Sequence, residues 1–233
     1  MADWRAEAER WWAAVLGLPI TAFHAGGVFP ASRFDHLGVL TVPGAAAPVV
    51  YGPAGSLPVL RSLQELAHSA GPVNASGLAA VPGLRAGRVL GPAWYGYATA
   101  GNLPALPTSA VRPLAAADLG LLARLHAATP PAEVAESGTD GLPAFGYLDA
   151  GDLMAVACLG TWRGMPTIGV LTHPQARGRS LARAVVTAAA REGLKNRPLV
   201  QYRAWRVNSA SLRVAAHTGF THFCDSLIID LDQ

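Results

Sequence analysis

The chain has 233 residues, of which 51% are hydrophobic and 14% charged, and its formal net charge is +3. This composition excludes an intrinsically disordered protein, which combines low hydrophobicity with high charge. The length fits two domains of ordinary size. No run of about 18 apolar residues occurs that could span a membrane. The charged N-terminal segment lacks the apolar stretch of a signal peptide, so we expect a cytoplasmic protein.

In the first half of the chain, apolar residues at three- and four-residue steps predict an amphipathic helix over 3–16. Short apolar runs between Pro and Gly predict strands between 39 and 51, and a helix is expected at 57–70 and a strand at 89–98. The segment 101–109 has the composition of a linker. We therefore predict an N-terminal α/β domain over 1–108 and a second domain over 109–233.

The second half alternates strand and helix patterns, which favours an α/β fold. Asp118 is the expected N-cap of a helix, along one face of which lie Leu119, Leu122, Leu125 and His126. A polar stretch, PPAEVAESGTDG, follows at 130–141. The later elements are strands at 144–148, 153–160 and 167–172, a helix, a strand at 199–205, a helix at 208–219 and a strand at 223–231.

Two cysteines, Cys158 and Cys224, lie in apolar surroundings and lack CxxC spacing. This pattern predicts buried thiols in a reducing compartment, in preference to a disulfide or a ligand pair. The seven histidines are scattered without ligand spacing, so no metal site is expected.

Half of the eighteen basic residues lie between 177 and 213, where Glu192 is the only acid. Such a local excess indicates an anionic partner, either a phosphorylated small molecule or nucleic acid. Helix N-termini offer unpaired N–H groups to anions, and the turn Arg177-Gly178-Arg179-Ser180 leads from a strand into a helix. Its glycine allows close backbone approach, and its arginines can pair with phosphate. A solvent-facing, arginine-rich helix cap would explain the same residues.

Neither GxxxxGK[ST] nor GxGxxG occurs, which excludes a P-loop and argues against a dinucleotide-binding site. The basic turn is followed by a strand, Asn208 and a short helix that ends at Gly219-Phe220, and this succession resembles the GCN5-related N-acetyltransferases (GNAT). The resemblance runs from Val111 to about Leu231. It implies a GNAT-like mixed, mostly antiparallel central sheet flanked by helices.

In that family the signature [Q/R]-x-x-G-x-[G/A] wraps the pyrophosphate of acetyl-CoA, and the preceding strand binds the pantetheine arm. The resemblance therefore implies acetyl-CoA as co-substrate. The cofactor-binding residues that it implies are Val170, Leu171, Thr172, Arg177, Gly178, Arg179, Ser180, Leu181, Ala182, Asn208 and Ser211.

The signature can be placed in two registers. On residues 177–182, Ser180 stands where the family usually has glycine, whereas on 175–180 Gly178 is matched and the last position fails. We prefer the first register, because it keeps the usual spacing from Pro174 and brings the turn to the start of the helix. A serine at this position could cap the helix and donate its hydroxyl to phosphate.

The reaction implied is direct attack of an amine on the acetyl thioester, with the oxyanion held by a backbone N–H of the strand 170–172. Many members carry a tyrosine as general acid where this chain has Ala215. Water, Ser211, Tyr202 or Cys224 could take that role, or no acid is needed.

Two residues are candidates for accepting the proton of the amine. Glu136 lies in the polar segment where family members build the acceptor side, and His173 lies beside the cofactor turn. A solvated loop carboxylate explains Glu136 equally well, and a turn or packing role explains His173.

The leading hypothesis is an acetyl-CoA-dependent N-acetyltransferase of a small-molecule amine or amino-acid-like acceptor, without nucleic-acid or membrane partners, as a monomer or homodimer. The alternative is a non-catalytic CoA-binding or regulatory module. A nucleic-acid surface ranks last, because only Tyr202 and Trp205 offer aromatic rings near the basic residues. The N-terminal half is expected to resemble a degenerate copy of the catalytic domain, and core packing explains its aromatic cluster at 94–97 equally well.

Overall fold

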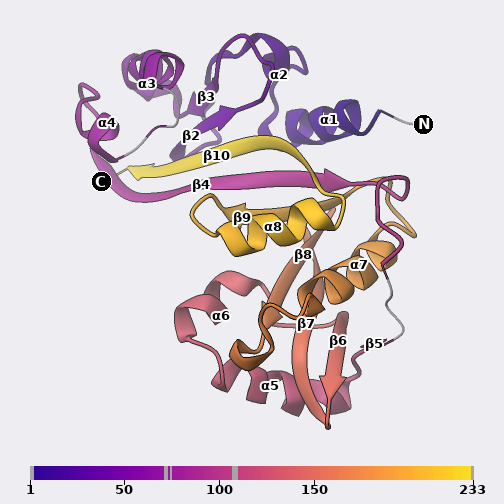
Figure 1. Cartoon of the computed structure of the whole chain (residues 1–233). Helices are drawn as coiled ribbons and strands as arrows, with labels where there is room; N and C mark the ends of the chain where they lie inside the picture. The colour runs from indigo at the N-terminus through magenta and orange to yellow at the C-terminus, as the bar shows by residue number, and fades with distance from the viewer. Residues whose placement is uncertain (1–2, 71–72, 74, 107–109, 232–233) are drawn as a thin grey trace. The chain divides into compact units, whose positions relative to one another are not determined.

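The computed structural model describes residues 3–70, 73, 75–106 and 110–231. The chain divides into two compact units (Figure 1): unit 1 consists of 1–95, 204–208 and 222–233, and unit 2 of 96–203 and 209–221. This division differs from the predicted boundary at 108, because the chain returns to unit 1 twice after residue 203. Part of the predicted linker, 107–109, lies outside the described residues. Separate domains over 1–108 and 109–233 stay a prediction.

Unit 1 combines four helices with strands in the order β1-β3-β2-β10-β4 among its described residues. The pair β1–β3 is parallel, and β2 is antiparallel to β3 and to β10. The last residues of β4 and the first residue of β10 belong to unit 2, and the rest of both strands belongs to unit 1. The elements are α1 (Trp4–Leu16), α2 (Ala22–Ala25), β1 (Gly27–Pro30), β2 (His36–Thr41), β3 (Val49–Gly52), α3 (Leu57–Ala70), α4 (Ala75–Ala79), β4 (Ala86–Ala98) and β10 (Thr221–Leu231).

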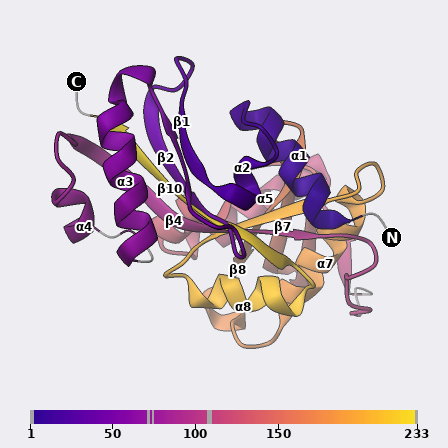
Figure 2. The same cartoon turned by 90° about the horizontal axis from the view of Figure 1, so that it is seen from above.

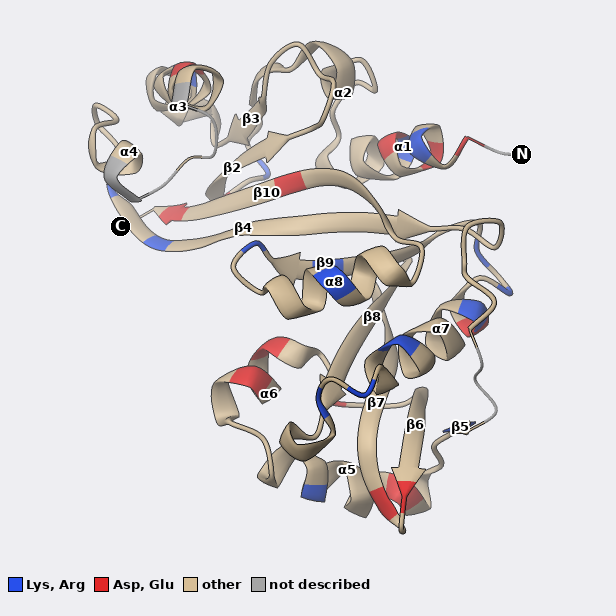
Figure 3. Ribbon diagram, in the orientation of Figure 1, with Lys and Arg blue, Asp and Glu red and all other residues tan. Residues whose placement is uncertain are grey.

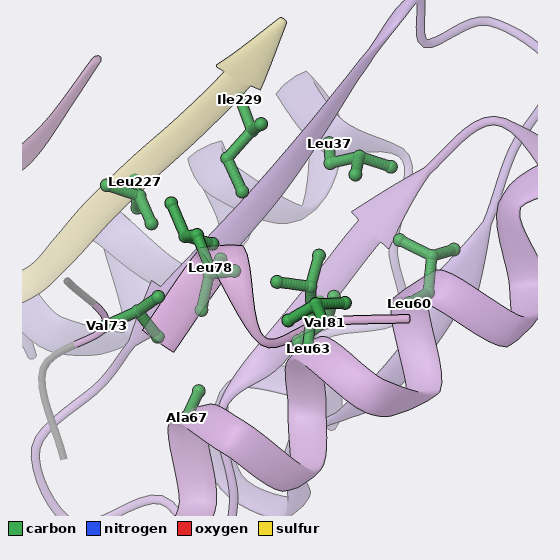
Figure 4. Close-up of a cluster of buried hydrophobic side chains, with 11 residues drawn as sticks. Leu37, Leu60, Leu63, Ala67, Val73, Leu78, Val81, Leu227 and Ile229 are labelled. Carbon is green, nitrogen blue, oxygen red and sulfur yellow. The ribbon is translucent and has the colours of Figure 1, made fainter. Parts of the chain in front are cut away.

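The core of unit 1 forms where α3 covers the strands. Helical spacing puts Leu60, Leu63 and Ala67 on one face of α3, and this face packs against Leu37 of β2 and Ile229 of β10 (Figure 4). In Figure 2, α3 lies along β2 and β10. The helices predicted over 3–16 and 57–70 and the strands predicted in this half are confirmed.

A second apolar contact holds α1 in unit 1. The ring of Trp12 meets Tyr95 edge-on at 5.2 Å and stacks on Phe223 at 6.5 Å. Trp12 of the first helix therefore serves packing, and Tyr95 of the aromatic cluster at 94–97 is also buried. Asp3 begins α1 by accepting the N–H groups of Arg5 and Ala6 with its carboxylate.

Unit 2 holds strands in the order β9-β8-β7-β6-β5 among the residues described. The pairs β5–β6, β6–β7 and β7–β8 are antiparallel, and β8–β9 is parallel. The elements are β5 (Val111–Pro113), α5 (Leu119–Ala127), α6 (Pro131–Ser137), β6 (Ala144–Asp149), β7 (Asp152–Trp162), β8 (Met165–Thr172), α7 (Leu181–Gly193), β9 (Val200–Trp205) and α8 (Ser209–His217). The mixed α/β architecture with a mostly antiparallel sheet is thus confirmed.

Helices cover both faces of β7 and β8. Side chains alternate along a strand, so Val156 and Cys158 point to one face of β7 and Leu159 to the other. The first face forms a core with Leu122 and Leu125 of α5. On the other face, α7 comes so close that a Cβ on its Gly193 would lie 3.1 Å from Leu159.

In unit 2 one local prediction holds only in part and two are wrong. Asp118 is the N-cap residue of α5, as predicted, but its side chain makes no capping bond, because the carboxylate accepts the N–H of Ala115 and pairs with Arg112. Leu119 is 46% exposed because α5 turns its first residue away from the core. The polar stretch at 130–141 contains a helix, α6, because Pro131 at its first turn has the backbone angle that a helix start requires.

Candidate functional site

The parallel strands β8 and β9 separate within unit 2. Their register pairs Thr167 with Gln201 and Ile168 with Tyr202, and it ends there. On its other side β8 stays paired with β7 as far as Thr172. The backbone from Gly169 to Thr172 therefore borders β7 on one side and leaves β9 on the other, so its outward N–H and C=O groups can bind an extended, amide-bearing ligand.

The turn between β8 and α7 contains two left-handed residues in close succession. Gly178 has φ +79° and Ser180 has φ +62°. Left-handed backbone costs a residue other than glycine about 1–2 kcal/mol, so Ser180 carries strain in the position where the resemblance expects glycine. The expected cap is wrong, because the Ser180 side chain makes no capping hydrogen bond to α7. Its left-handed backbone replaces the extended conformation of an ordinary N-cap.

This geometry suits an anion. Nothing lies within 4 Å of the position that a Cβ on Gly178 would take, and residues 177–180 are exposed. The thirteen residues of α7 begin at Leu181, and their aligned peptide dipoles place positive potential at this end. Leu181 is buried and Ala182 half-buried. Because both side chains are apolar, these two residues can offer an anion only their backbone N–H groups.

Both arginines of the turn are paired with carboxylates of other elements in unit 2. Arg177 donates from Nη2 to Oε2 of Glu133 on α6 at 2.6 Å, and Arg179 donates from Nη2 to Oδ2 of Asp149 on β6 at 3.2 Å. All four side chains are about half exposed. Figure 3 shows the basic turn before α7 and the acidic residues of α6. A phosphate group would therefore compete with two carboxylates for these arginines.

The residues of β8 that are predicted to bind the cofactor lie at the end of the strand, before this turn. Leu171 is buried in the core with α5, whereas Val170 and Thr172 are half-buried. His173 follows directly, and its Nδ1 accepts the N–H of Gln175 at 3.3 Å. The imidazole thus caps the short 3-10 turn at 174–176, which is the turn role considered for it. Only Nε2 remains for a proton from another group.

The candidates for the general acid differ in how deeply they are buried. In unit 2, Tyr202 is buried and its hydroxyl lies 2.9 Å from that of Ser211, while burial raises the pKa of Tyr202 to about 12. Ala215 of α8 is fully buried. In unit 1, Cys224 is fully buried, and burial raises the pKa of its thiol well above its ordinary value. Complete burial removes Cys224 as a proton donor to a ligand. Both cysteines are buried free thiols, as predicted.

Two further predicted site residues, Asn208 and Glu136, lie outside β8 and the basic turn. Asn208 belongs to unit 1, in the segment between β9 and α8, and its N–H donates to the carbonyl of Trp205 at 2.9 Å. Glu136 lies on α6 of unit 2 and its side chain is exposed. Its place on a helix corrects the expectation of a loop, and its exposure agrees with a solvated carboxylate.

The sequence did not predict the role of the segment after α6. Ser137 and Gly138 lie directly on β8, because a Cβ on Gly169 would lie 2.4 and 2.1 Å from their carbonyl oxygens. Nε2 of His126 lies 3.1 Å from Oγ1 of Thr139, which lies 2.6 Å from Oγ of Ser137. No spacing in the sequence links these residues, because α6 brings the chain back to α5 over thirteen positions.

The chain has the fold of GNAT-family acetyltransferases. A structure from Novosphingobium aromaticivorans assigned to that family superposes with a TM-score of 0.51 at 20% identity, over 65% of this chain and 69% of the other. A GNAT-family acetyltransferase from Colwellia psychrerythraea gives 0.52 at 18% identity, over 76% and 72%. No family model and no curated protein matches the sequence.

Neither a membrane span nor a metal cluster is found in the part of the chain that the structure describes. None of its helices is both long and apolar enough to cross a bilayer. Within the same residues, no group of three or more His, Cys, Asp and Glu side chains is gathered closely enough to hold a metal ion.

Proposed function

We propose that this chain is an acetyl-CoA-dependent N-acetyltransferase that acts on a small-molecule amine or amino-acid-like acceptor. The observation that carries the proposal is the separation of β8 from β9 after Ile168, beside the left-handed, basic turn that begins α7. Neither nucleic acid nor a membrane enters the proposal. The oligomeric state, monomer or homodimer, and a cytoplasmic location stay predictions.

The backbone of β8 would hold the pantetheine arm and the reacting carbonyl. Its outward N–H groups between Val170 and Thr172 can donate to the amide oxygens of the arm and to the oxyanion that forms during attack. The turn would hold the pyrophosphate, with N–H groups from Gly178 to Ala182 directed at it. On binding, Arg177 and Arg179 would exchange their carboxylate partners for phosphate oxygens, or share them.

A non-catalytic CoA-binding module is favoured by one observation. At the position of the family's tyrosine this chain has Ala215, which is fully buried, so no side chain there reaches a ligand. Under this alternative the turn still binds acetyl-CoA, but the thioester is not consumed. The pair Tyr202–Ser211 in unit 2 offers a hydroxyl donor on the neighbouring elements, and for this reason we place the enzyme first.

Calorimetry of the full chain with acetyl-CoA and with CoA tests both functions. A thiol-release assay over amines, polyamines, amino acids and peptides then separates them. Arg179→Glu should weaken binding about 10- to 100-fold, since a charge-assisted hydrogen bond contributes about 1.5–3 kcal/mol. The matched control is Arg197→Glu, the same charge reversal at an exposed position outside the turn.

Each outcome has a clear meaning. Binding with turnover of an amine supports the enzyme, and binding without turnover of any acceptor supports the module. A wild-type chain that binds neither acetyl-CoA nor CoA refutes both. Equal weakening by Arg179→Glu and Arg197→Glu would show that net charge, and not this turn, drives the binding.

A further inference from the structure

We infer that His126 is the terminal proton acceptor for the acceptor amine, reached through the hydroxyl groups of Thr139 and Ser137. This inference rests on the proposed acetyl transfer and assigns its missing base to three side chains of unit 2. Ser137 is the group that would touch the amine. Thr139 and His126 act through it.

The three side chains form a continuous chain of hydrogen bonds. Oγ of Ser137 lies 2.6 Å from Oγ1 of Thr139, which lies 3.1 Å from Nε2 of His126. The backbone N–H of Thr139 also donates to Oγ of Ser137 at 3.3 Å, which holds the first hydroxyl in place. Thr139 is 2% exposed, while Ser137 and His126 are half-buried. The chain therefore crosses a dry segment between two ends that ligand and solvent can reach.

The backbone at the Ser137 end of this hydrogen-bond chain touches the strand that carries the proposed reaction centre. The carbonyl oxygens of Ser137 and Gly138 would lie 2.4 and 2.1 Å from a Cβ on Gly169, so these residues touch β8 at that point. Gly169 directly follows Ile168, where the register with β9 ends. The proposed oxyanion donors begin one residue later, at Val170.

The hydroxyl protons can point toward His126. The Ser137 hydroxyl has two acceptors for its one proton, the carbonyl of Val134 at 2.7 Å and Oγ1 of Thr139. In the working direction Ser137 donates to Thr139, and Thr139 donates to an unprotonated Nε2 of His126. Turning the Ser137 hydroxyl to Val134 resets the chain after transfer.

The proton balance needs no further reagent. Ser137 takes one proton from the acceptor ammonium while His126 gains one at Nε2, which leaves a neutral amine. The amine nitrogen bonds to the acetyl carbon and the carbon–sulfur bond breaks. The second proton of the nitrogen passes to the departing thiolate, and His126 returns its proton to water. A tyrosine at position 215 is then unnecessary.

The electrostatic surroundings of His126 come from the elements packed against α5. The charged groups there are Arg124 on α5, Asp152 on β7, Asp118 before α5, Glu133 and Glu136 on α6, and Asp140 in the following segment. Arg124 pairs with Asp152, and Asp118 with Arg112. Glu133 pairs with Arg177, and Glu136 and Asp140 are exposed to solvent.

Nuclear magnetic resonance of the full-length protein with ¹⁵N-labelled histidine tests the direction of these hydrogen bonds without any acceptor amine. We expect the neutral imidazole of His126 to carry its proton on Nδ1, since Nε2 accepts from Thr139. The resonances are assigned by their loss in His126→Gln. A proton on Nε2 of His126 would overturn the inference, because the imidazole would then donate to Thr139.

Kinetics provide the second test, with the amine that the thiol-release panel finds fastest. His126→Gln and Thr139→Val should each lower kcat about 100-fold, and His126→Gln should remove the rise of kcat/KM with pH between about pH 5 and 8 where histidines titrate. Thr139→Ser should restore activity, because it keeps the hydroxyl. Circular dichroism and urea unfolding check that each variant folds.

Glu136→Gln tests the rival proton acceptor, since Glu136 lies one residue before Ser137 and is exposed. The rise of kcat/KM with pH should persist in this variant. Loss of the pH-dependent rise in Glu136→Gln and its retention in His126→Gln would overturn the inference while leaving acetyl transfer intact. A wild-type chain without turnover refutes the proposed function instead, and the tautomer measurement still decides the direction of the hydrogen bonds.

Discussion

Replacing Gly169 of β8 with alanine should destabilise unit 2. The new Cβ would lie 2.1 Å from the carbonyl oxygen of Gly138 and 2.4 Å from that of Ser137. Carbon–oxygen contacts normally lie at about 3.3–3.6 Å, so the segment after α6 must retreat by roughly 1 Å. Both obstacles are backbone atoms, which cannot rotate away as a side chain would. Overpacking of this kind costs about 1–3 kcal/mol, and we expect Gly169→Ala near the upper end.

Urea unfolding followed by circular dichroism measures this loss, which corresponds to a fall of roughly 5–10 °C in the Tm of a chain of this size. The matched control is Gly160→Ala on β7, the antiparallel partner of β8. The nearest atom to its Cβ would lie at an ordinary 3.7 Å. Both substitutions stiffen the unfolded chain equally, so their difference isolates the contact. If the two variants unfold within about 0.5 kcal/mol of each other, the close approach of the two segments is refuted.

Three other substitutions test the turn and its surroundings. Ser180→Gly should raise the free energy of unfolding, measured in urea, by roughly 0.5 kcal/mol. Glycine relieves about 1–2 kcal/mol of left-handed backbone strain, but it also makes the unfolded chain more flexible, which costs about 0.4–1 kcal/mol of stability. Glu133→Gln should tighten acetyl-CoA binding about 1.5- to 5-fold in calorimetry by freeing Arg177, with no such gain from the same change at the other acid of α6. Tyr202→Phe should make the free energy of unfolding less sensitive to alkali. Because burial raises the pKa of Tyr202 to about 12, its contribution to wild-type stability is complete below about pH 10. From there to pH 12 the free energy of unfolding falls by about 1.4 kcal/mol per pH unit. Equal slopes of wild type and Tyr202→Phe in that range would contradict the burial of this phenol.

Local patterns in the sequence predicted the elements well, because each depends on neighbouring residues. The helical spacing over 3–16 and 57–70 and the apolar runs of β6, β7 and β8 needed no knowledge of the rest of the chain. The prediction failed where a competing contact decided the outcome. Asp118 could cap α5 by its position, but Arg112 and the N–H of Ala115 hold its carboxylate instead.

Of the candidate site, only the basic turn before α7 could be located from the sequence. The basic turn is continuous in the sequence and resembles a known signature, so residues 177–182 could be named without a structure. The ion pair of Arg177 with Glu133 joins residues 44 positions apart, and that of Arg179 with Asp149 joins residues 30 apart. No periodicity encodes such contacts. The same is true of the division of the chain, because two C-terminal segments return to unit 1.

Residues 137–139, at the end of α6, illustrate how one short stretch serves both stability and the proposed chemistry. The carbonyl oxygen of Ser137 packs on Gly169, whereas its hydroxyl belongs to the hydrogen-bond chain that leads to His126. The two roles use different atoms, so different substitutions separate them. Gly169→Ala displaces the backbone and should lower stability and turnover together. Thr139→Val leaves that backbone contact in place and removes one hydroxyl, so a loss of turnover with little change in the approach to β8 would identify the hydroxyl chain as the functional part of this segment.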